Sequence, residues 1–303
     1  MALSELERSC LARLRGGERS QLAELQGDER LLDYALSTSL EAAATVRAVR
    51  QLPLSQIVEF KDDHSPVTRF EREIEIRAQE RLESLDESIA FVGEESGGQL
   101  PEKGLAVALD PVDGTWGLLN RTATCAVSLT IYRDGQAIVG VVANPATGEV
   151  GYVHSGTRSR LLQPGLLGEG DQACDLPLDR TPVDSVLVNV HPQRHIAGLV
   201  GALVEAWRGD GLNMVRMAGG SPALSLLDAS KGSFVYVNTW GRGPSVAYDL
   251  GAGLELVRGA GGDIVDLRGE PIEAIGHEGP FIAGLEAEAR DRVRRIAGQV
   301  MNP

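Results

Sequence analysis

Residues 105–115 read LAVALDPVDGT, an apolar run that ends in two aspartates three positions apart. A short apolar run bounded by turn residues is typical of a buried β-strand. Pro111 stiffens the turn that follows, and Gly114 allows backbone to approach a ligand closely. Thr115 adds a hydroxyl beside backbone amides that open a short helix. The stretch therefore predicts a strand that delivers both aspartates to its carboxyl end.

Asp110 and Asp113 supply hard oxygen ligands beside free amides, a combination that suits a divalent metal holding a phosphate. Asp, Pro and Gly are also common wherever a strand turns, so a turn without a ligand stays open on this stretch alone. Two other segments weigh against that alternative.

Residues 90–96 read AFVGEES, a second apolar run that ends in two acids, Glu94 and Glu95. Asp249 precedes small residues at the start of a third segment, YDLGAG at 248–253. The plain alternatives are a solvated glutamate pair and an acid that complements a helix dipole.

The composition is ordinary for a globular enzyme, with 43% hydrophobic and 24% charged residues in 303. The formal net charge of -14 argues against nucleic acid or an anionic membrane as a partner, because such partners require clustered Lys and Arg. An acidic protein that handles a phosphate must neutralise it locally, and bound cations are the obvious means.

Residues 1–8 are polar, and no uncharged run approaches the roughly 20 residues that span a bilayer, so we expect a cytoplasmic protein. Cys10, Cys125 and Cys174 are odd in number and widely spaced. They fit neither a disulfide framework nor a zinc site, and we expect buried or incidental thiols.

Apolar residues at helical spacing predict one or two amphipathic helices over 3–50 and another over 70–85, begun at residues 65–68. The second helix should bury Ile74, Ile76 and Leu82. Short β-branched runs then predict strands at 89–92, 105–109, 125–132, 137–142, 150–154 and 160–162.

Asp134-Gly135 is a hairpin turn signal within this antiparallel pattern. The stretch 165–182, rich in Gly, Asp and Pro, is the candidate boundary. Beyond it strands at 186–190, 213–217 and 233–237 alternate with helices at 192–208, 222–230 and 247–259, which indicates α/β layering. We expect residues 1–175 to carry the first helices, the antiparallel sheet and most metal ligands, and residues 176–303 to carry Asp249 and the substrate loops.

The three acidic segments occur together and in order, and they resemble the signature of the inositol monophosphatase family of lithium-sensitive, magnesium-dependent phosphatases. The resemblance runs from Lys61 to Gly262, and DPVDGT at 110–115 is its specific part. Supporting pieces are SPVT at 65–68 and GAGG at 259–262. The resemblance implies a layered α/β/α/β/α sandwich, two or three Mg²⁺ ions and a homodimer.

The resemblance also implies roles for individual residues. The expected metal ligands are Glu94, Asp110, Asp113, Asp249 and the carbonyl of Val112. Glu94 and Thr115 are expected to orient or deprotonate the attacking water, and the amides of Gly114 and Thr115 to bind the phosphate. Glu71 stands where relatives carry an Asp, and we take it as a further catalytic candidate.

Three residues are candidates for contacts with the substrate. Lys61 stands where the family carries a lysine, and Ser221 follows the strand that ends at 217. The segment RGPS at 242–245 resembles the corresponding segment of bacterial 3'(2'),5'-bisphosphate nucleotidases. The guanidinium of Arg242 would then be available to bind a second anionic group of the substrate. A solvated lysine and a surface arginine remain the alternatives. Trp116 and Trp240 suit stacking on a ring, although buried packing is the commoner fate of tryptophan.

The leading hypothesis is a magnesium-dependent phosphatase acting on a sugar, cyclitol or nucleoside phosphate. A nucleotidase-like activity is the first alternative. A catalytically silent protein that binds metal and phosphate is the second, since Glu71 and the loop after Thr115 depart from the family pattern. The sequence leaves the substrate open.

Overall fold

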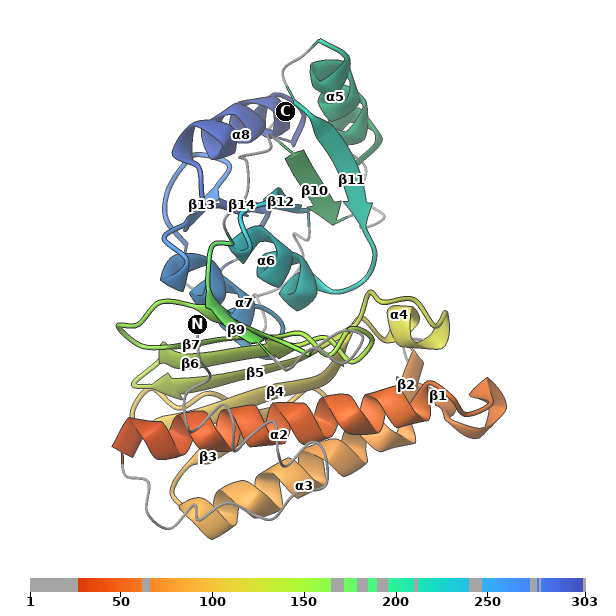
Figure 1. The fold of residues 1–303 in the computed structure, drawn as a ribbon, viewed down its shortest axis with the longest axis vertical. Helices are drawn as coiled ribbons and strands as arrows, with labels where there is room; N and C mark the ends of the chain where they lie inside the picture. Colours follow the sequence, from red (N-terminus) through yellow and green to blue (C-terminus); the bar gives the residue numbers. More distant parts are fainter. Residues whose placement is uncertain are drawn as a thin grey trace.

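The computed structural model describes residues 27–61, 66–164, 172–178, 185–189, 196–209, 212–239, 247–272, 277 and 279–301. Two helices, a seven-stranded sheet, two more helices, a five-stranded sheet and a final pair of helices follow one another as layers (Figure 1). The predicted α/β/α/β/α sandwich is therefore confirmed.

The outer helix layer is formed by α2 (Gly27–Val49) and α3 (Arg69–Leu85). Thr68 caps α3 in a capping box with Glu71, and the helix ends before Asp86, as predicted. Along the chain, α2 is followed by a short 3-10 turn (Leu54–Gln56) and then by an antiparallel pair of strands, β1 (Val58–Phe60) and β2 (Pro66–Thr68), before α3 begins.

Ile74 and Leu82 are buried as predicted, but the prediction for Ile76 is wrong, since 57% of it is exposed. Ile74, Ala78 and Leu82 recur every four residues and form the face that packs inward. Ile76 is two residues from Ile74, which turns its side chain by roughly 200° from that face.

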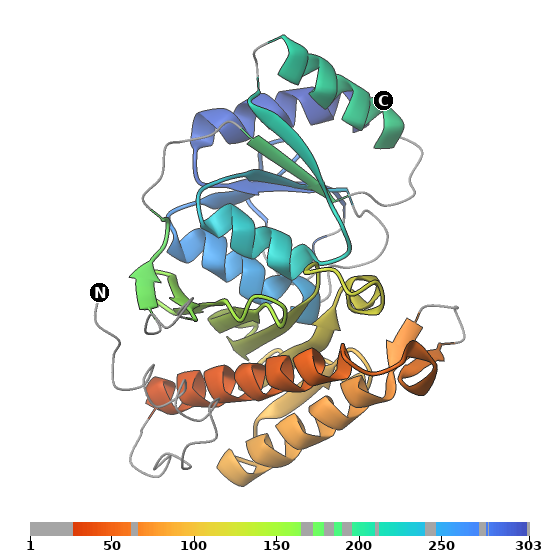
Figure 2. The ribbon, with the colours of Figure 1, turned by 45° about the vertical axis from the view of Figure 1, so that its right-hand side comes forward.

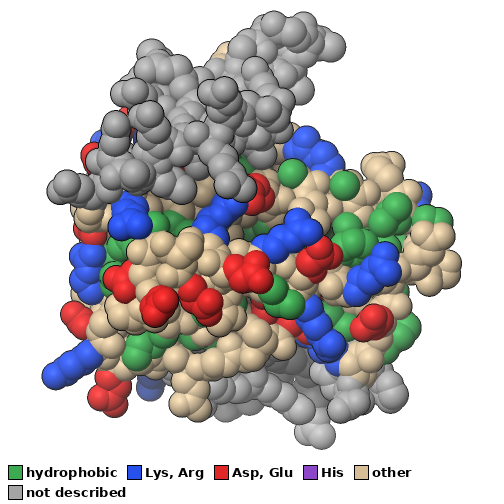
Figure 3. Space-filling view, turned by 90° about the horizontal axis from the view of Figure 1, so that it is seen from below, with side chains coloured by type: hydrophobic (Ala, Val, Ile, Leu, Met, Phe, Trp, Pro, Cys, Tyr) green, Lys and Arg blue, Asp and Glu red, His purple; other side chains and the backbone are tan. Residues whose placement is uncertain are grey.

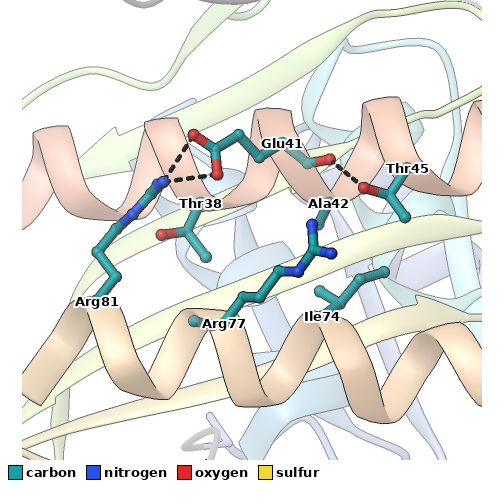
Figure 4. A pocket seen from close by; sticks show the side chains of 8 residues that line it. Thr38, Glu41, Ala42, Thr45, Ile74, Arg77 and Arg81 are labelled. Atoms are coloured by element: carbon teal, nitrogen blue, oxygen red, sulfur yellow. Dashed lines mark hydrogen bonds and ion pairs between the residues drawn. The ribbon is translucent and has the colours of Figure 1, made fainter. Parts of the chain in front are cut away.

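Charged side chains tie α2 to α3 on their outer side. Arg81 of α3 reaches across to Glu41 of α2 and donates to both carboxylate oxygens at 2.6 Å (Figure 4). Seen from below, basic and acidic side chains alternate over this face (Figure 3). The described part of this face therefore carries acidic and basic side chains in a mixed arrangement, with ion pairs such as Arg81–Glu41 between the two helices.

The first sheet lies against these helices, with its strands in chain order from β3 to β9. Its strands are β3 (Ala90–Gly93), β4 (Leu105–Asp113), β5 (Ala126–Arg133), β6 (Gln136–Ala143), β7 (Val150–His154), β8 (Arg160–Gln163) and β9 (Gln172–Asp175). β3 runs parallel to β4, and the other pairs are antiparallel. The predicted turn between β5 and β6 is confirmed by positive φ angles of 51° at Asp134 and 78° at Gly135.

Two details differ from the sequence prediction. β4 continues past Leu109 to Asp113, with an irregular register between Asp110 and Asp113. β9 lies within the stretch expected to be a boundary and pairs with β8, so this part of the stretch belongs to the first sheet. The division of the chain at residue 175 stays a proposal.

The second sheet has the order β11-β10-β12-β14-β13, in which the first three strands are parallel. Its strands are β10 (Ser185–Asn189), β11 (Met214–Ala218), β12 (Val235–Asn238), β13 (Asp263–Asp266) and β14 (Phe281–Gly284). The remaining long helices are α5 (Ile196–Arg208), α6 (Pro222–Ser230), α7 (Ala247–Gly259) and α8 (Ala287–Met301). α6 and α7 match the prediction residue for residue, whereas β13, β14 and α8 were not predicted.

Helices α6 and α7 lie between the two sheets, and α5 and α8 cover the far side of the second sheet (Figure 2). Buried apolar side chains fill each interface. Leu36 and Leu129 lie in the core between the outer helices and the first sheet, and Leu227 and Leu256 in the core between that sheet and α6 and α7. Leu254 and Phe281 lie in the core between α7 and the second sheet, and Val188 and Val293 in the core between that sheet and α8. Residues at the amino ends of α6 and α7 lie close to Asp113 at the end of β4.

Two further expectations concern cysteines and membranes. Cys125 is a buried free thiol and Cys174 a partly buried one, as expected, while Cys10 lies outside the described residues. None of the helices among the described residues combines the length and the apolar character that crossing a membrane requires.

Candidate metal centre

Carboxylates from distant parts of the chain meet in two groups. Asp110 and Asp113 at the end of β4 join Asp249 in the first turn of α7, and one oxygen from each lies within 4.8 Å of the others. Glu71 of α3 joins Glu94 and Glu95, which follow β3, within the same distance. The structure thus brings together all four acids predicted as metal ligands, together with Glu71, in two neighbouring groups.

The irregular end of β4 sets the direction of its two aspartates. The amide of Val112 donates to Asp110 Oδ1 at 2.8 Å, which closes a tight turn around Pro111. Asp113 Oδ2 accepts hydrogen bonds from Ser221 Oγ at 2.6 Å and from the amide of Ala223 at 2.7 Å. Asp113 therefore lies at the amino end of α6, where the helix dipole favours a negative charge.

The group of three aspartates carries unfavourable charge repulsion in the absence of a cation. Asp110 is 2% exposed and Asp113 4%. Burial, and then Glu94 and the neighbouring aspartates, raises the pKa of Asp110 well above its usual range. Burial and Asp249 do the same to the pKa of Asp113, against hydrogen bonds that lower it. Among the described residues, no Lys or Arg forms an ion pair with these three aspartates.

This donor set fits a hard divalent cation. All of the side-chain ligands are carboxylate oxygens, which Mg²⁺, Mn²⁺ and Ca²⁺ prefer over softer metals. A cation also compensates the negative charge of Asp110 and Asp113, which are buried and form no ion pair with a described Lys or Arg. The residues present therefore fit the magnesium that the sequence predicted.

These pKa values predict a pH-dependent stability. Burial, with Glu94 adding to it, raises the pKa of Asp249 from 3.8 to about 7, and burial raises that of Glu71 from 4.5 to about 8. Between the ordinary and the raised values, the folded chain binds protons that the unfolded chain has released. Its stability without metal must therefore fall as pH rises from about 4 to about 8.

Magnesium competes with protons for the same oxygens, so it should stabilise the protein more at pH 8 than at pH 5.5. Thermal unfolding with EDTA and with Mg²⁺ at these two pH values measures both effects. A metal-free melting temperature that rises over this interval would contradict the assignment.

Lys61 interacts with the second acidic group. Its Nζ lies 3.0 Å from Glu94 Oε1 and also pairs with Glu95. Burial lowers its pKa, but the hydrogen bonds with Glu95 and Glu94 outweigh that effect and raise it. Lys61 was predicted to contact the substrate, and the structure places its ammonium group against two of the acids of the site.

Glu71 is buried and takes part in both the cap of α3 and the second acidic group. Its Oε1 accepts a hydrogen bond from the amide of Thr68 at 2.6 Å, which completes the cap of α3. The same carboxylate lies in the group with Glu94 and Glu95. The departure from the family pattern at this position thus leaves a carboxylate in the acidic group.

The loop after β4 leads into a short helix, α4 (Thr115–Leu119), whose cap Gly114 has φ 89°. The hydroxyl of Thr115 donates to the carbonyl of Val112 at 3.3 Å, so two predicted site atoms are in contact. The first amides of a helix have no partner within it, and here they lie directly after Asp113. Trp116 is 60% exposed and is not packed in the core.

Ser221 was expected to contact the substrate, and the structure shows it 2% exposed against Asp113. Its hydroxyl also accepts from the amide of Leu224 at 3.1 Å as the cap of α6. Arg242 and Trp240 lie outside the described residues.

One buried acid was not identified from the sequence. Glu75 lies one turn after Glu71 on α3 and accepts hydrogen bonds from the backbone of the Glu94–Ser96 loop. The spacing of four residues between two glutamates on the buried face of a helix is the signal that could have found it.

Known proteins of one family are similar to this chain along most of its length. The inositol monophosphatase family model matches residues 28–299. Inositol-1-monophosphatase of Rhizobium meliloti (strain 1021) is 30% identical over 251 residues, which cover 77% of this chain and 83% of that protein. Inositol-1-monophosphatase ImpA of Mycolicibacterium smegmatis is 28% identical over 60% of this chain and 63% of its own length, which is under two thirds of that relative.

Among solved structures, the extragenic suppressor protein suhB from Bartonella henselae superposes with a TM-score of 0.71. The match covers 88% of this chain and 97% of that chain at 18% sequence identity. At such identity the likeness shows the fold alone.

Proposed function

The chain belongs to the inositol monophosphatase family of phosphoric monoester hydrolases, and we propose that it hydrolyses a small phosphate monoester with Mg²⁺ held by its two acidic groups. The convergence of the buried Asp110 and Asp113 with Asp249, none of which forms an ion pair with a described Lys or Arg, carries the proposal. Glu94 and the carbonyl of Val112 complete the proposed ligand set.

When bound, the cations supply a Lewis acid that neutralises phosphoryl oxygens and lowers the pKa of a coordinated water. The chain's own residues then orient the reactants. Glu94 has 28% of its side chain exposed, whereas Glu95 has 3%, so Glu94 is the acid that water can reach. We assign it the task of accepting a proton from the attacking water.

Thr115 and Gly114 hold the phosphate in this proposal. The hydroxyl of Thr115 already contacts the carbonyl of Val112, so it lies beside the proposed metal ligands. The phosphate would lie at the amino end of α4, because backbone amides at a helix start favour an anion. Glu71 supplies a further carboxylate behind Glu94.

A panel of phosphate esters tests the function. We expect Mg²⁺-dependent phosphate release from one member of a set with inositol 1-phosphate, fructose 1,6-bisphosphate, adenosine 3',5'-bisphosphate, histidinol phosphate, nucleotides and sugar phosphates. Silence across the panel with Mg²⁺ still bound would favour the catalytically silent alternative. The nucleotidase alternative predicts that adenosine 3',5'-bisphosphate is the best member.

Trp116 is the residue we assign to the body of the substrate. Its indole is exposed and directly follows Thr115, while Leu118, two residues later, is buried and anchors the helix. An exposed indole presents an apolar face on which a sugar ring or a base stacks, for about 1–3 kcal/mol. Trp116→Ala should therefore raise KM for the preferred ring-bearing ester by about tenfold and leave glycerol 2-phosphate unaffected.

Trp207→Ala on α5 is the matched control, because that indole is also exposed and lies away from the loop. Equal losses for both variants, or for both substrates, would contradict the stacking role.

The number of Mg²⁺ ions, the homodimer and the cytoplasmic location remain predictions of the sequence.

A further inference from the structure

Glu75 is buried beneath the loop that carries Glu94 and Glu95. It is 2% exposed, and its two carboxylate oxygens each accept one backbone amide. The amide of Glu95 donates to Oε1 at 2.9 Å and that of Ser96 to Oε2 at 2.8 Å. One side chain thus fixes two consecutive peptide groups in the loop.

The same loop is closed by the backbone. The amide of Gly93 donates to the carbonyl of Gly97 at 2.9 Å, and the amide of Gly97 donates back at 3.0 Å. Glu94 and Glu95 therefore project from a tight loop that is held at its base by these bonds and from below by Glu75. A carboxylate that accepts two amides makes charge-assisted bonds, which are stronger and more directional than neutral ones.

Gly93 leaves the space that Glu75 occupies. A Cβ at this position would lie 2.3 Å from Glu75 Oε2 and 2.4 Å from Ser96 Oγ. The absence of a side chain at the end of β3 and the buried glutamate on α3 are therefore complementary parts of one contact.

Burying Glu75 near Glu71, Glu94 and Glu95 is electrostatically unfavourable, because all four carry negative charge when ionised. The cost of burying the Glu75 carboxylate must be offset by favourable interactions, and the hydrogen bonds from the two amides supply part of them.

We infer that Glu75 is a positioning residue that holds the Glu94–Glu95 loop in the geometry that binds the cation. The inference rests on the proposed function, because it takes Glu94 as a metal ligand. Glu75 itself points at backbone amides, and its effect on the site passes through the loop. Helix α3 therefore contributes to the second acidic group in two ways. It supplies Glu71 as a member of the group, and it supplies Glu75, which holds the loop that carries the other two members.

Glu75→Gln tests the inference. The glutamine keeps the shape and one acceptor, but its amino group faces a backbone donor, so the loop loses one of its two bonds. We expect the apparent dissociation constant for Mg²⁺, measured by calorimetry without substrate, to rise about tenfold, the loss typical of residues that orient metal ligands. Turnover at limiting Mg²⁺ should fall in parallel and recover in part as Mg²⁺ is raised, because excess cation restores occupancy of the site.

Two controls separate positioning from general stability. Glu83→Gln makes the same chemical change on the exposed face of α3 and should leave Mg²⁺ binding unchanged. Ile74→Val removes a buried methyl group of α3 without touching the loop, and it should lower the melting temperature but not Mg²⁺ affinity. If Ile74→Val weakens Mg²⁺ as much as Glu75→Gln does, the inference is wrong.

A second variant covers the case in which Glu75→Gln fails to fold. Gly93→Ala should displace the Glu75 carboxylate and weaken Mg²⁺ binding to a similar extent, although Glu75 itself is unchanged. Wild-type Mg²⁺ affinity in folded Gly93→Ala would overturn the inference. A wild-type protein that binds no Mg²⁺ would instead refute the proposed function.

Discussion

Asp110→Asn is expected to lower phosphate release by about a thousandfold or more, equivalent to about 4 kcal/mol, while the protein stays folded. The asparagine Oδ1 can still accept the hydrogen bond that Val112 gives to Asp110 at 2.8 Å, so the turn after β4 is preserved. What is lost is a buried negative charge among acids. Measured turnover on the preferred ester and a calorimetric Mg²⁺ titration report the loss.

The same variant should be more stable than wild type without metal. Asp110 must either bind a proton or repel its neighbours at neutral pH, and asparagine does neither. For a chain of 303 residues, each kcal/mol of repulsion removed should raise the melting temperature by roughly 1–2 °C. Because activity and stability move in opposite directions, unfolding cannot explain the lost activity.

Asp134→Asn is the matched control. It makes the same chemical change in the β5–β6 turn, where the residue has a positive φ of 51° that asparagine tolerates. We expect it to leave activity, Mg²⁺ affinity and the metal-free melting temperature close to wild type. Substantial turnover by folded Asp110→Asn would rule out the assignment of this carboxylate as a metal ligand.

The fold was predictable where local pattern and burial coincide. The run LAVAL before Asp110 is buried on both faces, so a continuous apolar strand was the right interpretation. α6 and α7 carry clear start signals, Pro222 at a first turn and an acid in the first turn of α7, and their bounds were predicted residue for residue. β13 and β14 pair with each other, and β14 also pairs with β12. Their short runs gave no local signal that reveals such pairing.

The acids of the site were predictable because each follows an apolar run or opens a helix. Their neighbours were not, since contacts such as Lys61 with Glu94 join residues 33 positions apart. Glu75 illustrates the limit most clearly. Periodicity can show that it lies on the buried face of α3, but only the packing of that helix against the loop shows which amides it binds.

Gly114→Ala should damage both stability and activity although it removes no polar side chain. Gly114 has φ 89°, a region that costs an L residue about 1–2 kcal/mol. An added Cβ would also lie 2.9 Å from the carbonyl oxygen of Thr124 and 3.0 Å from that of Gly220. We therefore expect the free energy of unfolding to fall by about 2–4 kcal/mol in total.

The effect on activity should reach about a hundredfold, because Gly220 precedes Ser221, whose hydroxyl donates to Asp113 at 2.6 Å. A backbone displaced by the new methyl group carries Ser221 with it and turns Asp113 away from Asp110 and Asp249. A shift of about 1 Å at a reacting centre is enough for such a loss.

Gly135→Ala separates the two causes. Gly135 also has a positive φ, 78°, but an added Cβ would meet no atom within 4 Å. This control should lose about 1–2 kcal/mol of stability and retain its activity. If Gly114→Ala behaves like Gly135→Ala in both chemical denaturation and turnover, the close approach of the β4 loop to Gly220 does not position Asp113.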